Sequence, residues 1–195
     1  MRAKRVLDVV LTVFILALIF PFVVIIVILL LVSQKRPLLF KQERVGKNGI
    51  PFLIYKFRSM KIDSEKDGNP RLAKYNDNRE TVFGGFMRRH HFDEIPQFWN
   101  VLKGDMSIVG PRPERQFFID KIIEANPRYV ELYQIRPGLT SYATLHNGYT
   151  DTLEKMLSRL DMDLYYMKHQ SFMFDLRIIA ETVMRIIIGE SKYIK

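Results

Sequence analysis

The strongest feature of the hydropathy pattern is an apolar run near the N-terminus. From Val9 to Val32, 22 of 24 residues are apolar, and only Thr12 and Pro21 interrupt the run. A helix needs about 20 such residues to cross the hydrocarbon core of a bilayer, so we expect this segment in a membrane. A signal peptide fits less well, because its apolar region is only about 7 to 15 residues long and ends at a small-residue cleavage site.

The flanks of this run bear on its topology. Basic residues lie on both sides of it: Arg2, Lys4 and Arg5 before it, and Lys35, Arg36 and Lys41 after it. A spanning helix would put one basic cluster on the wrong side of the positive-inside rule, whereas a re-entrant helix–break–helix keeps both in the cytoplasm. Pro21 lies near the middle, where a proline bends or breaks a helix. A proline-kinked helix that spans the membrane stays open as the alternative.

Beyond the membrane segment, the pattern predicts a β-hairpin followed by helices. Runs typical of strands at 38–44 and 50–57 flank Asn48-Gly49, a turn pair that tolerates positive φ. A polar stretch without periodicity, 63–78, is expected to be a loop. Helical spacing marks three later segments: 114–125, 152–168 and 171–188. We therefore predict a mainly α fold with a small β-hairpin (α+β), divided into a membrane part, 1–36, and a folded part outside the membrane, 37–195.

The last helical segment has two interpretations. It carries a broad apolar face beside Arg177, Glu181 and Arg185 at i, i+4 spacing. It is either an interfacial helix that lies flat on the membrane or a core helix with surface ion pairs.

Composition narrows the classes of function. Lys and Arg number 30 and Asp and Glu 21, for a net charge of +9, of which +7 lies on residues 33–195. Such a surface favours anionic partners, including lipid headgroups, nucleotides and nucleic acid. The chain has no Cys, which excludes disulfides, thiolate metal sites and a Cys nucleophile.

Candidate chemistry begins at Asp93-Glu94. Adjacent carboxylates can serve as a nucleophile and a metal ligand, since a divalent cation on one of them suppresses their mutual repulsion. The alternative is a helix start, with Asp93 as N-cap, Glu94 in the first turn and Pro96 just inside it. Both interpretations stay open from these residues alone.

Three basic residues lie in settings suited to phosphate. Arg112 stands between Pro111 and Pro113, which limits the backbone freedom around its guanidinium. Arg136 precedes a Pro-Gly turn. Lys56, at the end of the predicted hairpin, is either a phosphate contact or a solvated strand lysine.

Five stretches, in order and spacing, resemble the bacterial sugar transferases, also called monotopic phosphoglycosyl transferases: 55–60, 93–97, 103–113, 136–140 and 163–166. The match covers nearly the whole chain and is similar to the small form of the family, without additional N-terminal spans. The resemblance implies a re-entrant membrane helix broken at Pro21, interfacial amphipathic helices, and a compact catalytic domain on the cytoplasmic face of the bacterial inner membrane.

The resemblance also implies an activity. A phosphosugar passes from a UDP-sugar to undecaprenyl phosphate, UMP is released, and assembly of a capsule, exopolysaccharide, O-antigen or glycoprotein glycan begins. Asp93 is then the nucleophile that forms a covalent phosphosugar intermediate, and Glu94 holds the cofactor Mg²⁺. Substrate-binding roles fall on Lys56, Arg88, Arg112, Arg136 and Asp163. The implied partners are the two substrates and membrane lipid, with no nucleic acid, and a homodimer is left open.

The chain departs from the family pattern in three places. The segment Ser141–Tyr149 lacks the usual Gln and final Arg, which leaves the donor sugar open. His90 and His91 are unusual neighbours of the acidic pair, and we interpret them as surface or packing residues rather than acid–base groups. Phe20 precedes Pro21 where Ser is frequent, so a hydroxyl at the helix break would come from elsewhere, for example Thr12.

A second function class is a membrane-anchored basic module that binds anionic lipid or nucleic acid without catalysis. It explains the charge and the apolar segment. It explains neither the arginine held between two prolines nor the Asp-Glu pair.

Overall fold

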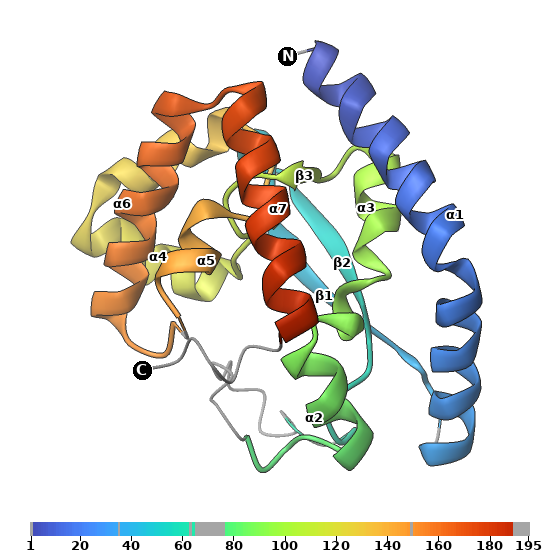
Figure 1. The fold of residues 1–195 in the computed structure, drawn as a ribbon. Coiled ribbons are helices and arrows are strands. Elements are labelled where there is room, and N and C mark those ends of the chain that lie inside the picture. The colour runs from blue at the N-terminus through green and yellow to red at the C-terminus, as the bar shows by residue number, and fades with distance from the viewer. Residues whose placement is uncertain (1, 35, 63, 65–76, 149, 189–195) are drawn as a thin grey trace.

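The structure is a computed structural model that describes residues 2–34, 36–62, 64, 77–148 and 150–188. It is mostly helical, with two small sheets. Figure 1 shows α1 (Arg2–Ser33) along one side of the molecule and α7 (Phe172–Ile188) crossing in front of the strands. The mainly α prediction with a small hairpin is confirmed, whereas most of the predicted loop 63–78 lies outside the described residues.

The predicted hairpin is present. β1 (Leu39–Val45) pairs antiparallel with β2 (Pro51–Phe57), and Leu39 lies opposite Phe57. The turn includes a short 3-10 segment, η1 (Lys47–Gly49), in which Asn48 and Gly49 have φ of 59° and 72°. Asn and Gly are the residues that adopt this left-handed conformation most readily, which explains the turn.

A second sheet was not predicted. β3 (Ser107–Val109) and β4 (Gly138–Thr140) are three residues each and pair in parallel. Strands this short give no recognisable alternation in the sequence. The chains approach so closely beyond β3 that a Cβ on Gly110 would lie 2.4 Å from the Arg136 carbonyl oxygen, so glycine is required there.

Three predicted helices are confirmed, and the remaining elements are short. The confirmed helices are α4 (Gln116–Ala125), α6 (Leu153–His169) and α7. The others are α2 (Val82–Arg89), η2 (Phe92–Glu94), α3 (Gln97–Lys103), η3 (Pro127–Gln134) and α5 (Tyr142–His146). The helix-start interpretation of the acidic pair is wrong, because Pro96 is the residue before α3 and the pair belongs to η2.

The break expected at Pro21 is corrected by the structure. α1 is one continuous helix with Pro21 inside it, so the segment is not divided into two helices. Figure 1 shows instead that the axis of α1 changes direction about half way along. A proline inside a helix removes one hydrogen bond and bends the axis, while the remaining bonds can keep the helix intact. Thr12 does not supply a hydroxyl to this bend, since its Oγ1 has no hydrogen-bond partner within the described chain.

Three apolar clusters hold the elements together. The first joins α4, η3 and α6, with Ile119 and Ile122 at its centre. The second joins β2, α3, β3 and α7, and the third buries Ile26 and Leu30 of α1 against Phe57 and Met87. Burial of such side chains contributes roughly 1.5–3 kcal/mol each. The acidic pair lies where α2, α3 and β2 meet.

Two helices keep apolar surface exposed. α1 is long and apolar enough to cross a membrane, with a mean hydropathy of 3.6 over its most apolar window, of which 11% is buried. α7 buries Ile178 and forms the Arg177–Glu181 ion pair, as predicted. It also exposes seven apolar residues: Phe172, Met173, Leu176, Val183, Met184, Ile187 and Ile188. α7 therefore combines a core face with an apolar outer face.

Candidate active site

The centre of the candidate site is the Glu94 carboxylate between two cations. Its Oε1 accepts hydrogen bonds from Lys56 Nζ at 2.6 Å and from Arg112 Nη2 at 2.9 Å. Burial alone would raise the pKa of Glu94, but the charges of Arg112 and Lys56 outweigh it and hold the pKa well below its ordinary value. Three residues that are far apart in the sequence thus form one charged group.

Asp93 lies beside this group and is itself buried. Its exposed fraction is 4%. Burial and the adjacent Glu94 carboxylate raise the pKa of Asp93, while the charges of Lys56 and Arg88 oppose the shift. A carboxylate that is poorly solvated and close to cations is suited to nucleophilic attack on a phosphate, which arrives with its own negative charge.

Local structure explains how η2 presents the pair. His91 has a left-handed conformation, with φ of 56°, and turns the chain from α2 into η2. Phe92 packs its ring against Phe22 of α1 at 4.8 Å, so the apolar side of the turn faces α1. Asn100 of α3 binds β2 next to Lys56, accepting from the Tyr55 backbone N–H and donating to the Leu53 carbonyl.

A buried ion network supports Arg112 from behind. The Glu114 carboxylate binds Arg159 at 2.8 Å and Arg44 at 3.1 Å. These cations lower the pKa of Glu114 although burial would raise it. Arg44 also donates to the Pro113 carbonyl at 3.2 Å. The turn that carries Arg112 is therefore fixed on its inner side, and a third of the Arg112 side chain stays exposed.

Asp163 lies in the interior of the same region. It is 2% exposed, and its Oδ1 has no hydrogen-bond partner among the described residues. Burial raises the pKa of Asp163 to about 7, against the charge of Arg159 one helical turn earlier. Asp163 thus lies near Arg159 and Glu114, which hold the Arg112 turn in place, rather than in the group formed by Glu94 and its two cations.

The remaining predicted site residues have other partners. Arg88 forms an ion pair with Glu80 at 2.8 Å, although its charge also acts on Asp93. Arg136 donates to the Gly104 carbonyl at 2.8 Å, which ties the β4 end to the α3–β3 connection. The structure therefore brings Lys56, Asp93, Glu94 and Arg112 together, with Arg88 near Asp93.

The two histidines before the acidic pair have contacts that the sequence did not predict. His91 Nδ1 lies 4.0 Å from Glu94 Oε2, so it borders the acidic pair. His90 packs between Phe86 and Phe92, and its Nδ1 hydrogen-bonds the Ile186 carbonyl in the last turn of α7 at 3.1 Å. The packing interpretation fits His90. Their position two and three residues before Asp93 was the signal in the sequence.

A divalent cation is compatible with the residues present. Mg²⁺ prefers oxygen ligands and is usually bound through one or two carboxylates together with substrate phosphates. Asp93 and Glu94 offer such carboxylates. No group of three His, Cys, Asp or Glu side chains comes together among the described residues, so substrate would have to complete the coordination.

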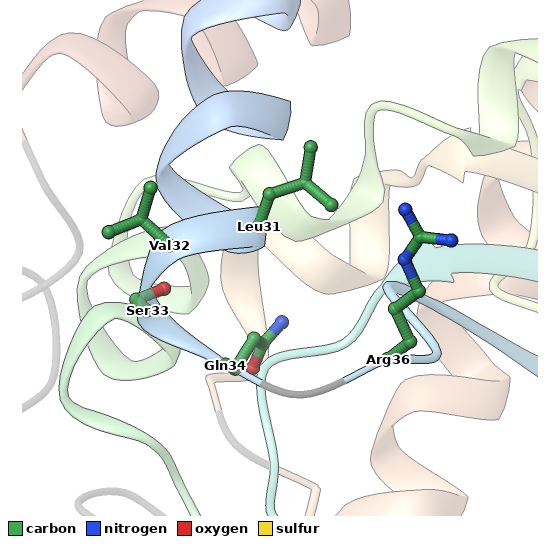
Figure 2. Close-up of a pocket in the computed structure, with 5 residues that line it drawn as sticks. All are labelled: Leu31, Val32, Ser33, Gln34 and Arg36. Atoms are coloured by element: carbon green, nitrogen blue, oxygen red, sulfur yellow. The ribbon is translucent and has the colours of Figure 1, made fainter.

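A separate hollow lies at the C-terminal end of α1. Figure 2 shows its five lining residues: Leu31, Val32, Ser33, Gln34 and Arg36. Gln34 donates to the Arg58 carbonyl at 3.0 Å, which fixes this end of the helix to the end of β2. None of the predicted site residues lines the hollow.

Comparison with known proteins decides the family. The family model described as bacterial sugar transferase matches residues 1–189. The chain belongs to the bacterial sugar transferase family. Within the family it is 40% identical over 192 residues to a UDP-glucose:undecaprenyl-phosphate glucose-1-phosphate transferase of Escherichia coli, covering 97% of this chain and 41% of that protein. It is 37% identical over 186 residues to an Aeromonas hydrophila UDP-N-acetylgalactosamine-undecaprenyl-phosphate N-acetylgalactosaminephosphotransferase, covering 95% and 44%.

Another member of the bacterial sugar transferase family is closer in length. A UDP-glucose:undecaprenyl-phosphate glucose-1-phosphate transferase of Caulobacter vibrioides is 38% identical over 193 residues, covering 97% of this chain and 72% of that protein. The chain spans about two fifths of the Escherichia coli and Aeromonas relatives. The match includes α1 and every residue of the candidate site.

Proposed function

We propose that the chain transfers a phosphosugar from a UDP-sugar to a polyprenyl phosphate such as undecaprenyl phosphate and so starts the assembly of a membrane-linked glycan. The observation that carries the proposal is the buried Asp93-Glu94 pair, with Glu94 held by Lys56 and Arg112 next to an apolar helix. The names of relatives that match nearly the whole chain support the same substrates.

Asp93 is the nucleophile in this proposal. A bond forms between its carboxylate oxygen and the phosphorus that carries the sugar, and the bond to the UMP oxygen breaks with the electron pair leaving on UMP. An oxygen of the polyprenyl phosphate then attacks the same phosphorus and releases the Asp93 carboxylate. One displacement between two bulky substrates thus becomes two smaller ones. Each step exchanges one phosphate bond for another, so no further energy source is required.

The surrounding charges prepare the site for phosphate. The exposed part of Arg112 can donate further hydrogen bonds to a donor phosphate without leaving Glu94, because a guanidinium has five N–H groups. Arg88 neutralises charge on the Asp93 side. Glu94, with Asp93 beside it, would hold Mg²⁺, which when bound stabilises negative charge on the transferring phosphoryl group.

The contacts of α1 support a monotopic arrangement. Asp8 near its start is bonded to β3, and Ile26 and Leu30 near its end are buried against the same folded part of the chain. If the 32-residue α1 stood perpendicular to the membrane plane, its two ends would lie about 48 Å apart along the membrane normal. We therefore propose that α1 enters the membrane without crossing it and is bent rather than broken at Pro21. The site then lies on the cytoplasmic face of the inner membrane.

A binding module without catalysis accounts less well for the same residues. Nucleic-acid binding needs cations that are free to contact phosphates along a backbone. Lys56 and Arg112 are instead bonded to a buried carboxylate. Anionic lipid can still contact the exposed basic surface, and this contact is compatible with the transferase.

The test is UMP release by the detergent-purified chain with Mg²⁺, undecaprenyl phosphate, and either UDP-glucose or UDP-N-acetylgalactosamine. We expect release with one donor, dependence on the acceptor for repeated turnover, and loss on chelation. If neither donor gives UMP release while the protein is folded and a related enzyme is active as a positive control, the proposal is contradicted for these donors. The binding module without catalysis would then be favoured.

A further inference from the structure

An acidic side chain of the membrane helix reaches into the folded part of the chain. Asp8 lies one residue before the apolar run and is 5% exposed. Its Oδ2 accepts a hydrogen bond from Ser107 Oγ at 2.7 Å, and its Oδ1 accepts one from the Ile108 backbone N–H at 3.1 Å. A buried carboxylate is unfavourable unless it is bonded in this way, so these contacts fix the position of Asp8 on β3.

β3 leads directly into the turn that carries Arg112. Only Val109, Gly110 and Pro111 separate Ile108 from it. The other side of the turn is held by β4, because the Gly110 N–H donates to the Thr140 carbonyl at 3.0 Å and the Gly138 N–H donates to the Pro111 carbonyl at 2.8 Å. Because the connection is this short and hydrogen-bonded, a shift of β3 also moves Arg112.

The same end of α1 also holds the element that follows the acidic pair. Arg5 donates to the carbonyls of Val101 and Leu102 at 2.5 and 2.8 Å, at the C-terminal end of α3. α3 begins three residues after Glu94. The first turns of α1 thus contact α3, which follows Glu94 in the sequence, and β3, which precedes Arg112.

We propose that Asp8 is a positioning residue for Arg112: it fixes β3 so that the guanidinium keeps the orientation in which it bonds Glu94 and receives the donor phosphate. The inference rests on the proposed function. Asp8 does not touch substrate and acts only through β3. Docking of the membrane helix and assembly of the phosphate site are therefore one event.

The experiment is a double-mutant cycle of Asp8→Ala with Arg112→Lys, read as kcat/KM for UMP release and as equilibrium binding of UMP. Misplacing a binding group by 1 Å can lower a rate about 100-fold, so we expect Asp8→Ala to lower kcat/KM about 10- to 100-fold in the wild-type background. Lysine is a flexible point charge that does not depend on the orientation of the turn. In the Arg112→Lys background the same substitution should therefore lower kcat/KM less than about twofold.

Two further variants separate positioning from stability. Asp8→Asn should restore most of the activity, because its amide oxygen can accept from Ile108 and its NH₂ can donate to Ser107 Oγ. Gln34→Ala is the matched control, since it removes one side-chain hydrogen bond from the other end of α1. It should change kcat/KM less than about twofold although it also lowers the melting temperature.

The outcomes are distinct. Equal factors for Asp8→Ala in both backgrounds, in kcat/KM and in UMP binding, would overturn the positioning role while wild-type activity persists. Failure of Asp8→Asn to restore activity although the protein is folded would also overturn it. No UMP release from the wild-type chain would overturn the proposed function and this inference with it.

Discussion

Replacing Lys56 by methionine tests the charged group at the centre of the site. The substitution keeps the length and apolar stem of the side chain and removes the cation 2.6 Å from Glu94 Oε1. Removing one partner of a buried ion pair costs about 3–5 kcal/mol. Arg112 still bonds the same oxygen at 2.9 Å, so we expect about 2 kcal/mol of lost stability, since a hydrogen bond to a charged group contributes about 1.5–3 kcal/mol.

This loss should be visible in both unfolding and catalysis. For a chain of this size, 2 kcal/mol corresponds to a fall of about 4–8 °C in melting temperature. Among the cations that oppose the raised pKa of Asp93, Lys56 has the largest effect. Its loss therefore leaves more of this carboxyl protonated. If the reacting state loses the same 2 kcal/mol, kcat/KM for UMP release falls about 30-fold.

The matched control is Lys41→Met, which removes a lysine from the exposed side of the same hairpin. It should change stability by less than about 0.5 kcal/mol and activity by less than about twofold. Lys56→Arg should recover part of the stability because it restores the charge. Equal melting temperatures and equal turnover rates for Lys56→Met and Lys41→Met would show that the Lys56 cation stabilises neither the fold nor the reacting state.

Two more predictions concern Glu114 and Asp163, which lie behind the turn that carries Arg112. Glu114→Gln removes the negative charge between two buried arginines and should lower the free energy of unfolding by about 3 kcal/mol, measured by denaturant titration, whereas Glu124→Gln on the surface should leave it unchanged. Asp163 has an ordinary pKa of 3.8 and a folded pKa of about 7, so between these values the folded chain keeps a proton that the unfolded chain has lost. Stability should therefore fall by about 1.4 kcal/mol per pH unit in this window, and Asp163→Asn, but not Asp161→Asn, should flatten the pH dependence of the melting temperature.

The regular elements of the fold could be predicted because their signals are local. The apolar run, the Asn48-Gly49 turn and the period of the last two helices each lie within one stretch of sequence. The β3–β4 sheet could not be predicted, since its strands are three residues long and pair across about 30 positions. The unbroken course of α1 through Pro21 was predicted only as the alternative, because the sequence does not show that Ile26 and Leu30 pack on the folded part and support the second half of the helix.

The residues of the site could be predicted from the sequence, but the contacts that hold them in place could not. Motif resemblance supplied Lys56, Asp93, Glu94 and Arg112, which the structure brings together. It did not indicate that Asp8 of α1 contacts β3, because a single acidic residue near an apolar run has no periodicity or spacing to mark its partner. Contacts of this kind depend on how the elements pack, which sequence patterns do not encode one by one.

The proposed function depends above all on Asp93, which carries the phosphosugar in the covalent intermediate. Its most direct test is the intact mass of the chain after incubation with the active UDP-sugar and Mg²⁺ in the absence of polyprenyl phosphate. We expect an added sugar phosphate that maps to Asp93, disappears when undecaprenyl phosphate is added, and does not form in Asp93→Asn or after chelation. An Asp93→Asn enzyme that still releases UMP at the wild-type rate, with no adduct on either protein, would contradict it.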